Sequence, residues 1–398
     1  MCVWAICGIR FGHLEGFLTS GNWSTGYFCQ NLEKTHDCSS YRTVSVMAVL
    51  GKRFEKIVKK RLSSMLRVAW FDERQFAYLN NRSSTQAVLS LVEIVKATLL
   101  QGKVAVVLFF DYTDAFGSVN RSKLLCKLCR DFGITGRLLL YLNDFLSGRK
   151  ARIKVNDLIG EWISSDSGAS AGTILGAILF INYVHDAPKD IFPKFADDFA
   201  GIATADDITE VEAKLQGLVN ELLKWSGGEW YLKLNLEKTK VTVFGNKQTG
   251  SVCIRAGGYQ IEKVEEFKYL GVILDSRLRF DAHAEYATTK ARKAFGKINR
   301  LINKRQGLTI QCGLELYKTL VKPHTEFSLP AWATMLESSI KLLEKVQGQC
   351  LRTIMGTSAH PSSEALEVIA NVIPVRARIE LCIREFMRIM LRDEWMML

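Results

Sequence analysis

The sequence predicts an α+β protein, and three features of its 398 residues lead to that class. Stretches with apolar residues at helical spacing alternate with short β-rich runs through the middle third of the chain. From about Asp281 onward the patterns are helical and basic, with few strand signals. Six prolines and the lack of any low-complexity stretch indicate a continuously folded chain. Because single cores stop growing near about 250–300 residues, two or more subdomains are expected.

The first expected elements are two amphipathic helices, residues 47–66 and 85–100, whose apolar residues recur at helical spacing. Val104–Phe110 is then a continuous apolar run, typical of a buried central strand, and it ends at Asp111. The elements expected after this strand are helices at 121–132 and 136–146, a short strand at 150–155, and a buried helix, apolar on all sides, at 175–183.

Residues 192–203 consist of two short apolar runs that flank a pair of acids. This pattern indicates a hairpin with Asp197 and Asp198 near its turn. The elements expected after it are an amphipathic helix at 206–225, strands at 232–234, 239–244, 252–255 and 269–274, and a separate helical subdomain from about 281 onward.

Composition restricts the partners and the compartment. Lys and Arg number 53 against 41 Asp and Glu, a net charge of +12, so the chain should favour polyanions or anionic membrane surfaces. No apolar run reaches the roughly 18–20 residues of a membrane helix, and Met1–Gly8 lacks the flanks of a signal peptide. We therefore expect a soluble, intracellular protein. Cys126 and Cys129 form the one close cysteine pair, and without a second pair they are expected to be reduced thiols rather than zinc ligands.

The acids carry the chemistry that the sequence predicts. Nucleotidyl transfer to a growing strand needs two divalent metal ions about 3.5–4 Å apart, bridged by carboxylates. An acid at the end of a core strand and an acid pair on an adjacent hairpin supply such ligands, so Asp111, Asp197 and Asp198 are the predicted metal ligands. Mg²⁺ prefers oxygen ligands, and Mn²⁺ is an alternative. Taken singly, the pair also fits a solvated turn, and Asp111 also fits a helix cap.

Ordered sequence blocks extend this prediction. The blocks are, along the chain, Trp23, Ser40–Arg42 with Val49–Ile57, Gln75–Tyr78 with Arg82–Thr85, Asp111–Val119, Gly168–Gly176, Phe195–Asp198, Trp230–Thr239 and Phe267–Asp275. On these blocks the chain resembles the reverse transcriptases of non-LTR retrotransposons, particularly the insect jockey-like and R1-like group. The blocks up to Thr85 look like the family's fingers, and the later ones look like motifs A, B, C and D and the closing strand block of its palm.

The resemblance implies a right-hand polymerase. Residues 1–103 would form an N-terminal segment and the fingers, residues 104–280 a palm with an antiparallel sheet and inserted fingers helices, and residues 281–398 a helical thumb and C-terminal region. The implied activity is RNA-directed DNA polymerisation with two Mg²⁺ ions, on an RNA template, a DNA primer and dNTPs. The family also implies nuclear residence, and the oligomeric state stays unassigned.

Further site residues follow from the resemblance. Phe116 would screen the 2′ face of the sugar and exclude a 2′-hydroxyl sterically, with a plain core position as the alternative. Lys238 would stand near the pyrophosphate as a general acid or charge stabiliser, or is a solvated lysine. Gly168 and Gly172 would let the backbone approach the nucleotide and template, although Gly168 also fits a plain loop.

Three more residues complete the predicted nucleotide-binding set. Tyr112 lies next to the first acid of motif A. Arg42 and Arg82 would contact the template phosphate or the triphosphate through bidentate guanidinium groups, or are surface charges.

The chain also departs from the family pattern. Ser170 and Ala171 stand where motif B usually has Pro-Gln, Gly117 replaces the motif A Asp, and Tyr78-Leu79 replaces Phe-Arg. The metal ligands stay while pocket residues change, so the alternative is a catalytically inactive, degenerate copy that retains nucleic-acid binding. Family members usually carry an endonuclease before the fingers, whereas the resemblance begins near His13, so a truncated chain is expected. Residues 342–354 and 364–376 resemble the helical region that follows the thumb.

Overall fold

The computed structural model describes residues 25–30, 41–46, 49–69, 72–151, 153–155, 158–165, 167–245, 252–302, 307–357 and 361–392. Trp23, Ser40 and the apolar start of the chain lie outside these residues. The chain divides into two compact units, each built from several segments. Unit 1 comprises Met1–Asn80, Phe110–Phe199 and Leu218–Leu236, and unit 2 comprises Asn81–Phe109, Ala200–Gly217 and Glu237–Leu398. The predicted divisions at 103/104 and 280/281 stay predictions.

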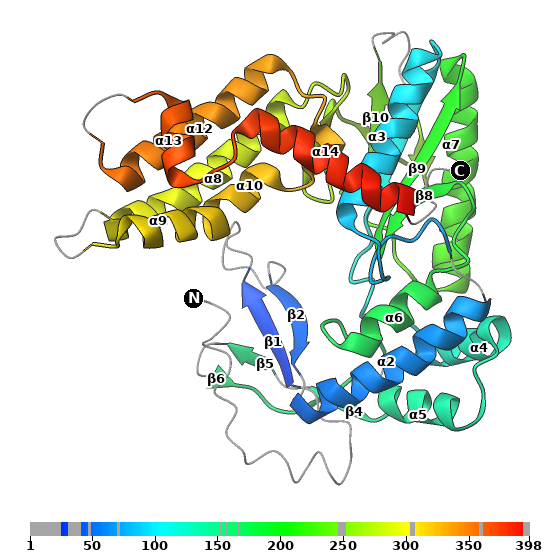
Figure 1. Ribbon diagram of the computed structural model, residues 1–398. Helices are drawn as coiled ribbons and strands as arrows, with labels where there is room; N and C mark the ends of the chain where they lie inside the picture. The colour runs from blue at the N-terminus through cyan, green and yellow to red at the C-terminus, as the bar shows by residue number, and fades with distance from the viewer. Residues whose placement is uncertain are drawn as a thin grey trace. The chain divides into compact units, whose positions relative to one another are not determined.

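Unit 1 combines helices with short strands (Figure 1). Its elements are β1 (Thr25–Gln30), β2 (Tyr41–Val46), α2 (Val49–Ala69), α4 (Arg121–Phe132), α5 (Gly136–Leu146), β4 (Arg149–Ala151), β5 (Ile153–Val155), β6 (Leu158–Ile159), β7 (Ile163–Ser165), α6 (Ile174–Tyr183), β8 (Ile191–Phe195), the end of α7 (Ile208–Leu223) and the π-helical stretch η3 (Lys224–Glu229). Its small sheets have the strand orders β2-β1-β5-β6 and β4-β7.

The helices predicted for this unit are confirmed, and local capping explains their ends. Asn120 accepts a hydrogen bond from the N–H of Lys123 (3.0 Å) at the start of α4, and Gly133 ends the helix at φ 63°. An Asn N-cap and a left-handed glycine C-cap are typical helix boundaries. The strand expected at 150–155 is divided instead between β4 and β5.

Unit 2 contains strands and the C-terminal helices. Its elements are α3 (Ser84–Leu100), most of β3 (Val104–Phe110) and of β9 (Asp198–Ala205), the start of α7, β10 (Lys240–Phe244), β11 (Arg255–Ala256), β12 (Tyr259–Gln260), β13 (Glu262–Lys263), β14 (Glu266–Tyr269), β15 (Val272–Asp275), α8 (Asp281–Ile302), α9 (Ile310–Leu316), η4 (Tyr317–Val321), α10 (Lys322–Glu326), α11 (Leu329–Trp332), α12 (Glu337–Met355), α13 (Ser363–Ala370) and α14 (Val375–Arg392).

The strands that this unit contributes to the five-stranded sheet have the order β13-β10-β3-β9. β10 pairs antiparallel with β3 in the register Lys240↔Phe109, and parallel with β13. The predicted palm sheet is therefore antiparallel at β3 and β10 and becomes mixed at β13.

Three predicted strands differ from the structure. The run 269–274 is a hairpin rather than one strand, because Leu270 (φ 45°) and Gly271 (φ 91°) turn the chain between β14 and β15. Two successive positive φ values are what a tight hairpin turn requires. Residues 232–234 contribute only a bridge between Leu234 and Tyr112. Of residues 252–255, only Arg255 joins a strand.

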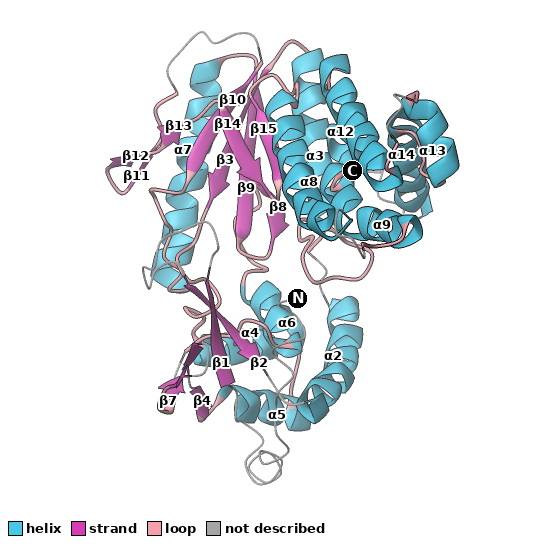
Figure 2. Cartoon of the chain, turned by 90° about the vertical axis from the view of Figure 1, so that its left-hand side faces the viewer, coloured by secondary structure: helices cyan, strands magenta, loops and turns pink. Residues whose placement is uncertain are grey.

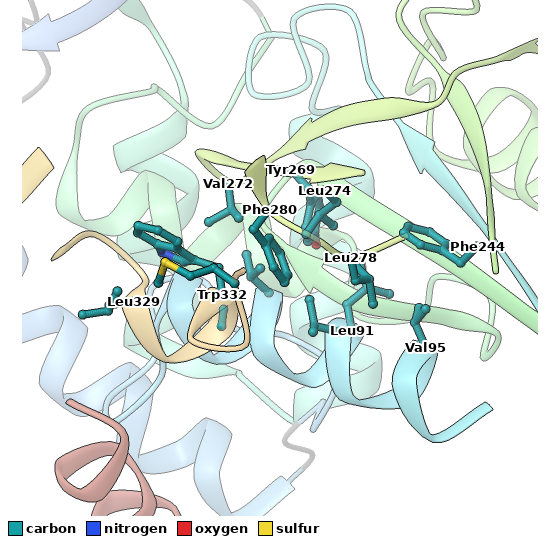
Figure 3. Packing of buried hydrophobic residues seen from close by; sticks show 14 of the residues in the cluster. Leu91, Val95, Phe244, Tyr269, Val272, Leu274, Leu278, Phe280, Leu329 and Trp332 are labelled. Carbon is teal, nitrogen blue, oxygen red and sulfur yellow. The ribbon is translucent and has the colours of Figure 1, made fainter. Parts of the chain in front are cut away.

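The core of unit 2 is formed by one face of α3 and the strands. All seven residues of β3 are buried, as its continuous apolar run predicts. Figure 3 shows Leu91 and Val95 of α3 packed with Phe244, Leu278 and Phe280, while Trp332 lies against the other end of the cluster. Figure 2 shows α3 and α8 beside β14 and β15. This cluster fixes the strand that leads to Asp111.

The C-terminal helices of unit 2 share a second apolar cluster. α8 packs beside α12 and η4, and α12 packs beside α13. The predicted helical subdomain after residue 281 is thus helical throughout its described part. None of the helices that the structure describes is both long and apolar enough to span a bilayer.

Candidate active site

Asp111 follows the last residue of β3 and is half-buried. Its carbonyl accepts a hydrogen bond from the N–H of Asn235 (2.7 Å), and the next residue, Tyr112, forms an antiparallel bridge with Leu234. Main-chain contacts with the Leu234–Asn235 segment therefore hold this acid at the strand end. All of these residues belong to unit 1.

Asp197 and Asp198 lie at the hairpin turn that the sequence predicts. Phe195 ends β8, Ala196 takes a left-handed conformation (φ 55°), and Asp198 begins β9. Ala196 is buried, Asp197 is half-buried and Asp198 is exposed. The turn therefore presents two adjacent carboxylates toward solvent on a fixed backbone.

Tyr78 is a residue of this site that sequence reasoning missed. Partial burial, followed by the negative charges of Asp197 and Asp198, raises the pKa of its hydroxyl. Both carboxylates therefore lie within electrostatic reach of the same phenol. Tyr78 is 46% exposed and has φ 59°, so it projects from a turn rather than from a regular element. Its sequence signals are its place at the end of the Gln75–Tyr78 block and the departure of Tyr78-Leu79 from the family's Phe-Arg.

Phe116 connects Tyr78 to the helix that follows motif B. Its ring stacks on Phe180 of α6, with ring centres 4.2 Å apart and 18° between the planes, and it meets Tyr78 edge-on at 6.4 Å. Phe116 as a whole residue is half-buried. A ring braced in this way can act as a rigid steric wall.

The motif B loop is bound to motif A through the main chain. The N–H of Ala169 donates to the carbonyl of Phe116, and that of Gly168 donates to the carbonyl of Val119, both at 2.9 Å. Gly168 has φ 90°, and a Cβ there would lie 3.1 Å from the Phe116 carbonyl oxygen. Only glycine fits this close approach without strain. Gly172 also has a left-handed backbone (φ 89°), and its approach to the nucleotide stays a prediction.

Glu55 of α2 holds the start of α6, next to this loop. Its Oε2 accepts the N–H groups of Ile174 (2.7 Å) and Leu175 (3.0 Å). The carboxyl is 1% exposed, and burial raises its pKa, although the two hydrogen bonds and the positive charge of Arg149 act in the opposite direction. Burial likewise lowers the pKa of Arg149 to about 10.

The position of Asp114 explains why glycine fits at residue 117, where the family's motif A has an acid. The N–H of Gly117 donates to Asp114 Oδ1 (3.3 Å), and a Cβ at residue 117 would overlap the same carboxylate. The carboxylate of Asp114 thus occupies the space next to residue 117. Glycine has no Cβ, so Gly117 fits this turn without such an overlap.

The remaining predicted site residues lie outside the turn that carries the acid pair. Tyr112 is 6% exposed, with its ring edge-on to Phe199 and its hydroxyl pKa raised by burial, so any nucleotide contact would fall to its main chain. Lys238 is exposed in unit 2 at the turn before β10, and Arg82 lines a pocket of about 480 Å³ in unit 2. Arg42 lies in β2, and its side chain is outside the described part of the structure. Their roles stay predictions.

The carboxylates at the turn are chemical groups that bind hard cations. Asp197 and Asp198 offer adjacent carboxylate oxygens, the ligands that Mg²⁺ prefers. Within the described residues, however, no three His, Cys, Asp or Glu side chains are close enough together to hold a metal ion. Ligation by Asp111 together with the pair therefore stays a prediction. Cys126 and Cys129 are free thiols on α4.

Acids at a strand end and at a neighbouring hairpin turn, beside a braced aromatic ring, are an arrangement typical of template-directed nucleic-acid polymerases. Comparison with known proteins narrows this class. The family model described as reverse transcriptase (RNA-dependent DNA polymerase) matches residues 32–274, more than half of the chain. The chain belongs to the reverse transcriptase family.

Two similar proteins come from mobile elements of Drosophila melanogaster. The probable RNA-directed DNA polymerase from transposon X-element is 24% identical over 332 residues, and the RNA-directed DNA polymerase from mobile element jockey is 24% identical over 343 residues. The alignments cover 80% and 83% of this chain but only 36% and 37% of those proteins. The predicted membership of the non-LTR retrotransposon group is thereby confirmed.

Among solved structures, apo telomerase from Candida tropicalis aligns with a TM-score of 0.47 at 11% identity, covering 91% of this chain and 64% of that one.

Proposed function

We propose that this chain is an RNA-directed DNA polymerase, which adds dNTPs to a DNA primer on an RNA template. The observation that carries the proposal is the pair Asp197 and Asp198 at a fixed turn, electrostatically coupled to Tyr78, whose ring meets Phe116. Asp111 belongs to the same compact unit, at the end of a buried strand. The family match supports the reaction type.

Asp111, Asp197 and Asp198 would hold two Mg²⁺ ions, or Mn²⁺ in their place. When bound, the metal ions would activate the primer 3′-hydroxyl and neutralise the triphosphate. Phe116 would select deoxynucleotides, because a ring braced on Phe180 leaves no room for a 2′-hydroxyl. Lys238 would stabilise the leaving pyrophosphate, and Arg42 and Arg82 would contact phosphates, as the family motifs suggest.

The positive charges on the surface of α2 favour the binding of a polyanionic template. Lys52, Arg53, Lys56, Lys60 and Arg61 are exposed, whereas Glu55, the helix's acid, is buried. A helix that shows solvent only positive charge attracts phosphate backbones with a salt-sensitive affinity. Fingers, palm and thumb would correspond to residues 1–103, 104–280 and 281–398, and nuclear residence is proposed from the family alone.

Primer extension on an RNA template tests the activity. We expect Mg²⁺-dependent extension with dNTPs, loss of it with a chelator, and loss of it in Asp197→Asn. The matched control is Asp190→Asn, an exposed aspartate before β8, which should leave extension unchanged.

The second candidate is an inactive copy that keeps nucleic-acid binding, favoured by Ser170 and Ala171 in place of the family's Pro-Gln. Template–primer binding without any extension, in wild type as in Asp197→Asn, would establish this candidate and refute the polymerase.

A further inference from the structure

The segment Asp72–Ala77 runs alongside β8, the strand that leads to the acid pair. Gln75 and Lys194 form a parallel bridge, in which the N–H of Phe76 donates to the carbonyl of Lys194 and the N–H of Lys194 donates to the carbonyl of Arg74, both at 2.8 Å. All of these residues lie in unit 1. The backbone of β8 is thus fixed three residues before Asp197.

A buried ion pair strengthens the same junction. Lys194 is fully buried and pairs with Asp72, and its ammonium group also donates to the carbonyl of His185 (3.2 Å). Breaking one partner of such a buried pair is costly, so β8 cannot slide easily along the Asp72–Ala77 segment.

The side chain of Gln75 extends this fixation to the turn itself. The residue is 3% exposed, and its Oε1 accepts the N–H groups of Ala196 (3.0 Å) and Ala77 (2.9 Å). Ala196 precedes Asp197, and Ala77 precedes Tyr78. One buried oxygen atom therefore links the two turns that carry the acid pair and the phenol.

Both turns need this support. Ala196 (φ 55°) and Tyr78 (φ 59°) are non-glycine residues in the left-handed region, a backbone conformation that is unfavourable for residues with a Cβ. Because the Ala196 donor is buried, losing its acceptor would also leave an unsatisfied N–H group. The turn would then relax toward another backbone conformation and move Asp197.

We propose that Gln75 is a positioning residue that sets the placement of the Asp197 and Asp198 carboxylates relative to Tyr78, and with it the affinity of the acid pair for divalent metal. This inference rests on the proposed polymerase function. Gln75 touches neither substrate nor metal in this role and acts through the main chain of Ala196 and Ala77.

The test measures Mn²⁺ binding by electron paramagnetic resonance on the full chain, which does not depend on activity. Gln75→Met keeps the length of the side chain and removes the acceptor, and Gln75→Asn withdraws it by one methylene. Gln347→Met is the matched control, a glutamine 5% exposed in α12 whose Oε1 accepts the Tyr317 hydroxyl (3.0 Å). Asp197→Asn defines the signal of the site.

We expect both Gln75 variants to bind Mn²⁺ roughly 10-fold more weakly, as loss of a residue that orients metal ligands usually does. In primer extension we expect the loss to fall mainly on kcat rather than on the KM for dNTP, because Gln75 acts on the acid pair and does not itself contact the nucleotide. Gln347→Met should match the wild type in both measurements even if its melting temperature falls.

Unchanged Mn²⁺ affinity in a folded Gln75 variant, or an equal loss in Gln347→Met, would overturn the positioning role and leave the polymerase proposal intact. If the wild type shows no Mn²⁺ site that Asp197→Asn removes, the metal site itself fails, and the role of Gln75 fails with it. Melting curves of each variant separate these outcomes from unfolding.

Discussion

The carboxylate of Glu55 lies 2.7 Å from the backbone nitrogen of Ile174, 119 residues later in the chain. Glu55 is thereby the cap of α6, a helix whose own N-cap, Thr173, satisfies only the N–H of Gly176. A negative charge at a helix N-terminus is favourable, and here it offsets part of the cost of burying the carboxyl. The start of α6 in turn ends the loop that carries Gly172.

Removing this cap should destabilise unit 1. Glu55→Ala leaves two N–H groups without their acceptor, and we expect a loss of about 2 kcal/mol in the free energy of unfolding, measured in urea. Glu55→Gln keeps an acceptor and removes the buried charge, so its loss should be clearly smaller. Glu93→Ala, an exposed acid of α3, is the control. Equal midpoints for Glu55→Ala and Glu93→Ala would contradict the capping role.

Restoring the family's acid at residue 117 should conflict with Asp114. A Cβ at 117 would overlap the Asp114 carboxylate, and two like charges would then share one turn. We expect Gly117→Asp to cost about 1–3 kcal/mol in the wild-type background. In an Asp114→Gly background, where φ 44° suits glycine, most of this cost should disappear.

A double-mutant cycle measured by chemical denaturation gives this coupling directly. A coupling below about 0.5 kcal/mol would mean that the two positions are independent and that Asp114 does not explain Gly117.

Trimming the Phe116 ring should relax sugar selection. Phe116→Val removes the wall braced on Phe180 and opens space for a 2′-hydroxyl. The ratio of kcat/KM for dNTP over rNTP should fall by roughly 10-fold or more, since steric discrimination of one small group is worth about 1–3 kcal/mol. Phe132→Val, on a ring of unit 1 that packs against His185, should lower stability without changing the ratio. An unchanged ratio in Phe116→Val would assign Phe116 to the core alone.

Local patterns predicted the elements better than they predicted the contacts between them. The bounds of α4 and α5 follow from amphipathic spacing, and the acid pair at the hairpin turn follows from two apolar runs around it. The β14–β15 turn was missed because the apolar run continues through Leu270, whose left-handed backbone no side-chain pattern indicates.

The candidate active site shows the same limit: local sequence patterns do not predict its tertiary contacts. Asp197 and Asp198 are adjacent in sequence and were predicted together, whereas Tyr78 and Gln75 reach them only through tertiary structure. The Gln75 hydrogen bond to Ala196 joins residues 121 positions apart, a pairing that a single sequence does not encode locally. The sequence places Glu55 in a fingers block, and its capping role depends on α6 being packed against α2.

A last prediction concerns pH, through His283 in the core of unit 2. Its Nδ1 accepts the N–H of Ile273 (3.2 Å), its ring meets Trp332 edge-on, and it is 2% exposed. Burial, with a smaller contribution from the positive charge of Lys268, lowers its pKa from 6.5 to about 4. His283 therefore takes up a proton near pH 6.5 in the unfolded chain, but only near pH 4 in the folded protein.

Stability should consequently fall as the pH drops through this window, by roughly 3 kcal/mol for this group at most. His283→Gln, which keeps an acceptor and cannot be charged, should flatten the loss of unfolding free energy between pH 7 and 4.5, measured in urea at each pH. His324→Gln removes an exposed histidine whose pKa is also lowered, by slight burial and the positive charge of Lys290, and should flatten this loss less than His283→Gln does. Carboxylates that titrate below pH 5 affect all three proteins alike, so the difference between them isolates His283. If the pH profile of His283→Gln runs parallel to that of the wild type, protonation of His283 does not contribute to the loss of stability at low pH.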